Sequence, residues 1–253
     1  MLKIRQIALV ARHDLVAAQE FIDVLGLAIA FHDPGIKNIG LHNTLMPIGT
    51  QLLEIVAPIT EGTTAERYLL RRKGAGGYMV ITQTDDHPPY KQRVDELGIR
   101  KVAEAEEKNY SIMQLHPADT SGSFLEIDVQ VGGEDFEGPW MPAGKNWQQA
   151  IRRDKVDGIA AAEVQSPDPS AVADRWSKIL DLSVETDDDG NPALVLDNAT
   201  IRFVPAEDGR GEGLGGIDVV AVDKEAVLEA AEQRGVRQKD DVLLMGGIRF
   251  RLV

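Results

Sequence analysis

The stretch KIRQIALVARHDLVAAQEFIDVLG, residues 3–26, contains the pattern that decides the fold. Its first eight residues are mostly β-branched or apolar and predict a strand. Asp14 follows, and we expect it to cap a helix that ends at Gly26, where a left-handed residue can close the last turn. Apolar side chains recur at helical spacing between them: Leu15, Ala18, Phe21, Ile22 and Leu25.

The same order of strand, acidic cap and helix recurs three more times. Strands are predicted at 78–84, 159–164 and 217–222, with helix caps at Asp85 or Asp86, Asp168 and Asp223. Further strand-like stretches follow the four helices: 27–31, 39–46, 52–56, 111–116, 124–129, 193–196, 200–204, 242–245 and 248–253. A unit of this kind cannot cover its own apolar face, so units must pair. We therefore predict an α+β fold in which four βαβββ-type units pair into two cupped mixed-sheet half-barrel domains. The repeat leaves open whether units pair one with two and three with four or across the domains, and the connector between units two and three favours the first.

A segment rich in Gly, Pro and acidic residues separates the second unit from the third. It also contains Trp140 and Trp147, which a freely mobile linker rarely carries. We therefore predict a first domain over 1–132, a connector over 133–156 that docks onto a domain, and a second domain over 157–253.

The composition is strongly acidic, with 27 Lys and Arg against 41 Asp and Glu and a net charge of −14. Such a surface repels nucleic-acid phosphate and anionic lipid, so we expect neither nucleic acid nor membrane as a partner. The chain has no cysteine, which excludes disulfides and thiolate metal sites. No stretch is typical of a signal peptide or long enough to span a membrane, so we expect a cytoplasmic protein.

Four segments of the first domain resemble, in order, motifs of the vicinal oxygen chelate superfamily, which comprises glyoxalase, bleomycin-resistance and dioxygenase proteins. They are IRQIALVARHDLVAAQEFIDVLGL (4–27), NIGLHNTLMPIGTQLLEIVAP (38–58), AERYLLRRKGAGGYMVITQTDD (65–86) and LHPADTSGSFLEID (115–128). The last resembles the closing hairpin of methylmalonyl-CoA epimerase-like members. The second domain resembles the superfamily in its pattern of elements only.

The resemblance implies a metal site on the floor of the first cup, with one ligand from each quarter. Its first position corresponds to Gln6, where some glyoxalases have Gln in place of His, its second to Glu54 and its fourth to Glu126. The third position, usually His, corresponds to Met79, and a thioether is a poor ligand for a hard divalent ion. The resemblance therefore implies a divalent metal (Ni, Mn, Zn, Fe or Mg) on Gln6, Glu54 and Glu126, or a cup that has lost its metal.

Strand patterning indicates which neighbours share this face. In 124–130 the apolar residues Leu125, Ile127 and Val129 share one face of the strand. Glu126 lies on the other face, which should point away from the helices. A turn at 47–50 would place Asn43 opposite Glu54, whereas a one-residue slip would place His42 there, as a substitute for the missing histidine. In a regular strand Tyr78 would face away from Met79. The candidate substrate-binding residues are His42, Asn43, Tyr78, Met79 and His116, although His116 also suits a turn.

Three functions remain open. By resemblance the protein is a metal-assisted isomerase, epimerase or lyase of a small oxygenated metabolite, in which Glu54 or Glu126 moves a proton. Alternatively it is a metal-free small-molecule binding protein, as bleomycin-resistance relatives are, and the apolar Met79 favours this. The third is a structural or regulatory relic of the fold. In the second domain Arg202, Arg249 and Arg251 predict either exposed arginines or an anion pocket. We expect a small-molecule ligand and allow for a homodimer.

Overall fold

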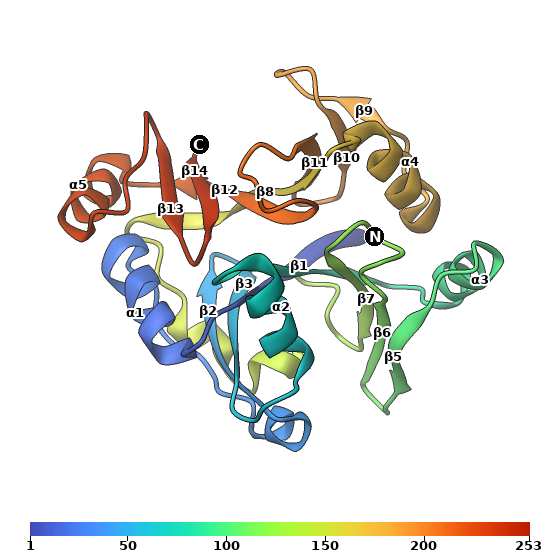
Figure 1. Ribbon diagram of the computed structural model, residues 1–253. Helices are drawn as coiled ribbons and strands as arrows, with labels where there is room; N and C mark the ends of the chain where they lie inside the picture. The colour runs from blue at the N-terminus through green and yellow to red at the C-terminus, as the bar shows by residue number, and fades with distance from the viewer.

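The computed structural model describes residues 1–253 as two seven-stranded mixed sheets (Figure 1). The strand order is β2-β3-β1-β4-β7-β6-β5 in the first sheet and β13-β14-β12-β8-β11-β10-β9 in the second. The first sheet contains β1 (Leu2–Val10), β2 (Leu41–Ile48), β3 (Gln51–Pro58), β4 (Gly76–Thr84), β5 (Lys101–Glu106), β6 (Tyr110–Leu115) and β7 (Phe124–Gln130). The second contains β8 (Val156–Ser166), β9 (Glu185–Thr186), β10 (Pro192–Val195), β11 (Thr200–Pro205), β12 (Gly213–Ala221), β13 (Val242–Met245) and β14 (Ile248–Leu252).

The helices follow the repeat with one addition. They are α1 (Asp14–Leu25), α2 (Thr64–Arg72), α3 (Pro88–Glu96), α4 (Pro169–Leu180) and α5 (Lys224–Arg234), with short 3-10 segments η1 (Pro34–Ile39), η2 (Met141–Ala143) and η3 (Trp147–Ala150). The sequence pattern predicted all of the α-helices except α2, which lies between the first two units. None of the helices is long and apolar enough to cross a membrane.

Each unit begins and ends on strands that run parallel to each other, and the first strands of paired units run antiparallel at the centre of each sheet. This confirms the predicted α+β class, and of the two pairings left open the structure has one with two and three with four. The predicted strand at 27–31 is wrong, because only Phe31 forms an isolated bridge, to Leu45. The first and fourth units accordingly have one strand fewer than the other two.

The acidic caps differ between the units. Asp168 and Asp223 accept hydrogen bonds from Ala171 N and Ala226 N, at 3.1 and 3.0 Å, and cap α4 and α5 as predicted. Asp14 does not cap α1; it lies inside the first turn, and the residue before it has no side-chain capping bond. Nor does Asp85 or Asp86 cap α3, which begins after His87.

Two separate cores hold the molecule together. The larger one, of 45 residues, contains apolar side chains of both sheets and of α1, α4 and α5. Across it α1 contacts α5 and α3 contacts α4, so the helix-bearing faces of the two sheets meet (Figure 1). The smaller core covers the opposite face of the first sheet, and contains residues of α2 and of the connector between β7 and β8. That second face is the cup in which the sequence placed its candidate site.

Candidate active site in the first cup

The four central strands of the first sheet bring the predicted ligand positions onto one face. Ala8 of β1 lies beside Glu54 of β3 on one side and beside Met79 of β4 on the other. On the next pair of strands, Glu126 of β7 lies beside Ile81 of β4. As the alternation in β7 predicted, Glu126 faces the cup.

Glu54 is held by two amide groups. Asn43 Nδ2 donates to its Oε1 at 2.6 Å, and Gln6 Nε2 donates to its Oε2 at 2.9 Å. Burial raises the pKa of Glu54 to about 7; these two hydrogen bonds oppose the rise, and the nearby charge of Glu126 adds to it. A carboxyl group whose pKa is about 7 can take up and release a proton near neutral pH.

Glu126 is buried beside a second carboxyl group. Its Oε2 accepts a hydrogen bond from Gln114 Nε2 at 2.7 Å, and the same amide nitrogen lies 3.5 Å from Met79 Sδ. Asp128 accepts a hydrogen bond from the Tyr110 hydroxyl. Burial raises the pKa of both carboxyl groups, and the charge of Glu126 raises the pKa of Asp128 further. Burial therefore disfavours the ionised form of both carboxyl groups.

The donor atoms of this site do not fit a divalent metal ion. Trp140 Nε1 donates to Gln6 Oε1 at 2.8 Å, which engages the atom that would have to bind the ion. Both oxygens of Glu54 face amide hydrogens. Met79 supplies only a thioether at the third position. A metal on Gln6, Glu54 and Glu126 would require the amide of Gln6 to leave its indole partner.

The connector closes much of this cup. Trp140 and Trp147 are each 1% exposed, and the guanidinium of Arg5 lies 5.5 and 5.1 Å from their ring centroids. Arg5 also donates to the backbone carbonyls of Phe136 and Gly138. Burial lowers the pKa of Arg5 to about 10. The two tryptophans indicated that the connector packs on a domain, but nothing in the sequence showed that one reaches Gln6.

The β2–β3 hairpin has a different register from either expectation. Ile48 pairs with Gln51, so the turn contains only two residues, and Leu45 lies opposite Glu54. Asn43 is two positions away on the same face and still reaches Glu54. His42 lies on the other face, where its Nδ1 is 2.8 Å from Asp14 Oδ2. The prediction that His42 replaces the missing histidine in the cup is therefore wrong.

Tyr78 also differs from its expected direction. The pairing of β1 with β4 is irregular between Ala8 and Leu9, and this bulge turns both Tyr78 and Met79 into the cup core. The Tyr78 ring lies 4.9 Å from that of Phe124. The preceding Gly77 is required by close packing, because a Cβ there would lie 2.4 Å from the carbonyl oxygen of Leu214 in the other sheet.

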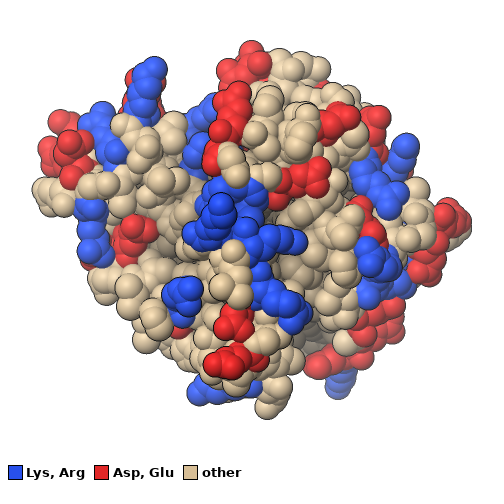
Figure 2. Space-filling view, in the orientation of Figure 1, with Lys and Arg blue, Asp and Glu red and all other residues tan.

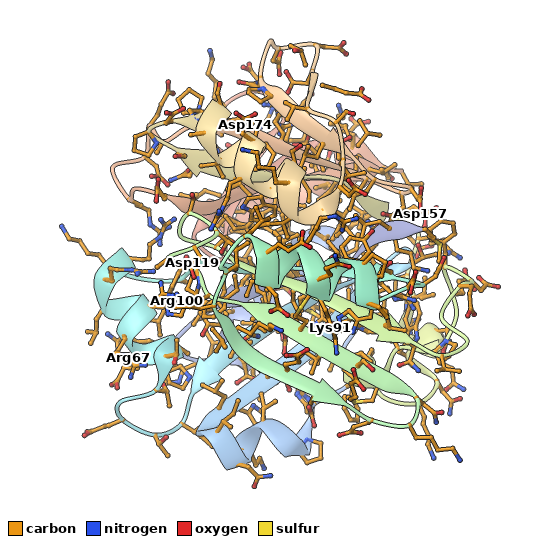
Figure 3. All side chains as sticks on the ribbon, turned by 90° about the vertical axis from the view of Figure 1, so that its right-hand side faces the viewer. Arg67, Lys91, Arg100, Asp119, Asp157 and Asp174 are labelled. Carbon is orange, nitrogen blue, oxygen red and sulfur yellow. The ribbon has the colours of Figure 1, made fainter.

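The cup is open at one edge, between α2 and the loop that joins β6 to β7. A cavity of about 370 Å³ lies there, lined by Thr64, Arg67, Tyr68, Arg71, Val102, His116, Pro117 and Phe124. Lys and Arg side chains gather near the centre of the face that α2 occupies (Figure 2). The loop is fixed by Arg100, which donates to Asp119 at 2.9 and 2.8 Å (Figure 3). His116 keeps its turn role, since its Nδ1 accepts from Ala118 N at 3.1 Å.

The centre of the second sheet contains a buried group of ion pairs. Arg202 is 7% exposed and donates twice to Asp218, at 2.7 and 2.8 Å, and once to Glu163, at 3.0 Å. Arg249 also pairs with Glu163. The arginine at the centre of this sheet is therefore neither exposed nor free for an anion; it neutralises two buried carboxylates.

A comparison with protein-family models gives no match, and a comparison with curated protein sequences gives no significant match. Among solved structures, a hypothetical protein from Staphylococcus aureus is similar over 100% of this chain and 99% of its own, with 13% identity and a TM-score of 0.65. A mutant of 4-hydroxymandelate synthase from Streptomyces coelicolor is similar over 94% of this chain and 77% of its own, with 15% identity and a TM-score of 0.67. At these identities the likeness concerns the fold.

Proposed function

We propose that this chain, which has the fold of the vicinal oxygen chelate superfamily, binds a small anionic molecule with an aromatic or apolar body at the mouth of its first cup. The cavity beside α2 is the observation that carries this proposal, because it joins an aromatic floor to a basic rim. Binding there requires no metal ion on Gln6, Glu54 and Glu126, whose donor atoms are engaged with one another and with Trp140.

The charge at the rim favours an anion. Arg67 donates to Gly62 O and to the Thr64 hydroxyl, and Arg71 lies over the Tyr68 ring at 5.4 Å. Neither arginine forms an ion pair with a carboxylate, although the chain carries 41 acidic residues. Two guanidinium groups without an acidic partner beside a cavity favour a carboxylate or phosphate ligand.

The floor favours an apolar body. Tyr68 and Phe124 are each 4% exposed and belong to the cup core, so their rings are held in place by packing. Val102 adds an exposed apolar side chain at the rim. Preformed aromatic walls bind flat rings with little loss of side-chain entropy.

Proton transfer is the second candidate function, and the raised pKa of Glu54 favours it. A carboxyl group that titrates near pH 7 can remove a proton from the carbon next to a carbonyl group and return it. Asn43 and Gln6 would then stabilise the ionised form through the hydrogen bonds that they already donate. This chemistry would make the protein an isomerase, epimerase or lyase, and a metal-assisted form would further need Gln6 to leave Trp140.

Benzoate and benzamide, which differ mainly in charge, test the proposal as probes. We expect benzoate to shift the backbone amide resonances of His116 and Phe124 in a nuclear magnetic resonance titration, with benzamide binding more weakly. The double variant Arg67→Ala, Arg71→Ala should weaken benzoate binding about tenfold or more, because a charge-assisted hydrogen bond contributes about 1.5–3 kcal/mol.

The matched control is Arg152→Ala, which removes an exposed arginine that bonds only to backbone carbonyls of the connector. It should leave benzoate binding unchanged. Equal binding of the two probes, or unchanged benzoate affinity in the double variant, would overturn the proposal. Glu54→Gln separates the two functions: it should spare benzoate binding even if it abolishes turnover of a true substrate.

A further inference from the structure

Three side chains from separate segments meet on the side of β2 that faces away from the first cup. They are Asp14 in the first turn of α1, His32 in the segment before η1, and His42 in β2. One ligand atom of each residue lies within 4.8 Å of the others. The chain contains only five histidines, so the meeting of two of them beside an acidic residue is a specific feature of this fold.

Asp14 faces the two histidines rather than capping its helix. Its Oδ2 accepts a hydrogen bond from Thr44 Oγ1 at 2.7 Å and lies 2.8 Å from His42 Nδ1. These two contacts hold the carboxyl group in place beside the histidines, and the start of α1 has no side-chain cap.

The His32 ring is oriented by the nitrogen that does not need to bind a ligand. Its Nδ1 lies 2.8 Å from the carbonyl oxygen of Asn43, which can only accept, so this nitrogen carries the hydrogen and Nε2 is left with a free lone pair. Metal-bound histidines commonly donate their other N–H to a carboxylate or a backbone carbonyl. In His42, Nδ1 lies 2.8 Å from Asp14 Oδ2, so this nitrogen and this oxygen can bind the same ion once the proton between them is released.

The rings are also close and accessible. Their centroids are 5.5 Å apart and their planes are inclined by 24°. His32 is exposed, and the His42 side chain is 27% exposed, so an ion can approach from solvent. Ligand atoms around a tetrahedral Zn²⁺ lie roughly 3.3 Å apart, which the exposed His32 can reach by side-chain rotation.

We propose that Asp14, His32 and His42 form a binding site for a divalent transition metal ion, with Zn²⁺ as the expected ion and at least one position left open to solvent. Two imidazoles and one carboxylate suit Zn²⁺, Co²⁺ or Fe²⁺, whereas Mg²⁺ and Ca²⁺ prefer oxygen ligands alone. The site is separate from the cup and independent of the function proposed above. Asn43 links the two, because its carbonyl faces His32 while its side chain bonds Glu54.

Isothermal titration of the chelator-treated protein with ZnCl₂ tests this site. We expect one ion per chain, and a Co²⁺ absorption band of a site with nitrogen and oxygen ligands. His32→Ala and His42→Ala should each weaken Zn²⁺ binding about 100-fold or more. Removing a residue that only hydrogen-bonds a metal ligand already lowers metal affinity about 10- to 100-fold, and these two residues would be ligands themselves. Because His32 is exposed, its substitution should leave the fold intact.

His13→Ala is the matched control, since it removes an exposed histidine next to Asp14 that makes no side-chain capping bond. It should bind Zn²⁺ as the wild type does. The variant Glu54→Gln, Glu126→Gln should also retain Zn²⁺, which distinguishes this site from one in the cup. Absence of Zn²⁺ binding in the wild type, or equal binding after His32→Ala and His42→Ala, would overturn the proposal. A failure of the protein to bind benzoate would count against the function proposed for the cup and not against this metal site.

Discussion

Replacing Glu54 by Gln should change how the stability of the protein depends on pH. Raising the pKa of a carboxyl group from 4.5 to about 7 disfavours its ionised form by about 3 kcal/mol in the folded chain. Between these two values the unfolded chain is ionised at this residue while the folded chain keeps its proton. The stability that protonated Glu54 gives to the folded chain is therefore fully present below pH 4.5 and is lost as the pH rises through 7. Glutamine does not titrate, so this loss is absent from the variant.

The free energy of unfolding of wild type and Glu54→Gln, measured with urea at several pH values, gives the comparison. The variant should be less stable at about pH 5, because its amide must place one N–H₂ group against the donors of Asn43 or Gln6. Neither amide can turn over freely, since Asp33 N and Trp140 Nε1 hold their oxygens at 2.8 Å.

Between about pH 5 and pH 8 the variant should gain about 2–3 kcal/mol relative to wild type. Glu207→Gln, in an exposed loop, should run parallel to wild type over the same range. If the curves of Glu54→Gln and wild type are also parallel, Glu54 ionises normally and the proposed proton transfer loses its support.

Two further substitutions test how the cups are held. Trp140→Phe should reduce the free energy of unfolding by about 1–3 kcal/mol, because Gln6 Oε1 loses its buried donor. Urea denaturation measures this change. An unchanged free energy of unfolding would mean that the indole does not bond to Gln6. Arg202→Met should cost about 3–5 kcal/mol at neutral pH by leaving Asp218 and Glu163 buried without it, and acid should reduce that cost as the carboxylates take up protons. Arg251→Met is the control, because the Arg251 side chain is 42% exposed, and it should lower the free energy of unfolding by less than about 1 kcal/mol. An equal loss of stability in both variants would show that the buried ion pairs of Arg202 contribute no more than an exposed one.

Which side chains line the cup depends partly on contacts between residues that are far apart in the sequence. The central residues Gln6, Glu54, Met79 and Glu126 could be placed on one face from strand alternation and motif resemblance, because side-chain direction in a strand is a local property with a period of two. The bulge that turns Tyr78 inward and the two-residue turn that shifts the β2–β3 register depend on how neighbouring strands pair. Alternation within a single strand carries no information about either.

The strand, helix and glycine order that begins at residues 3–26 determined the fold by itself, because a repeated unit with one apolar face has few ways to cover it. That prediction is confirmed by the two sheets and by the fold that they share with solved structures. Only the tertiary structure decided which side chains meet in the cup and which side of β2 His42 faces. Trp140 reaches Gln6 across 134 positions, and His42 turns towards Asp14 across 28. Such contacts depend on the packing of a connector and of a helix start against the finished sheet, and no local spacing in the sequence encodes that packing.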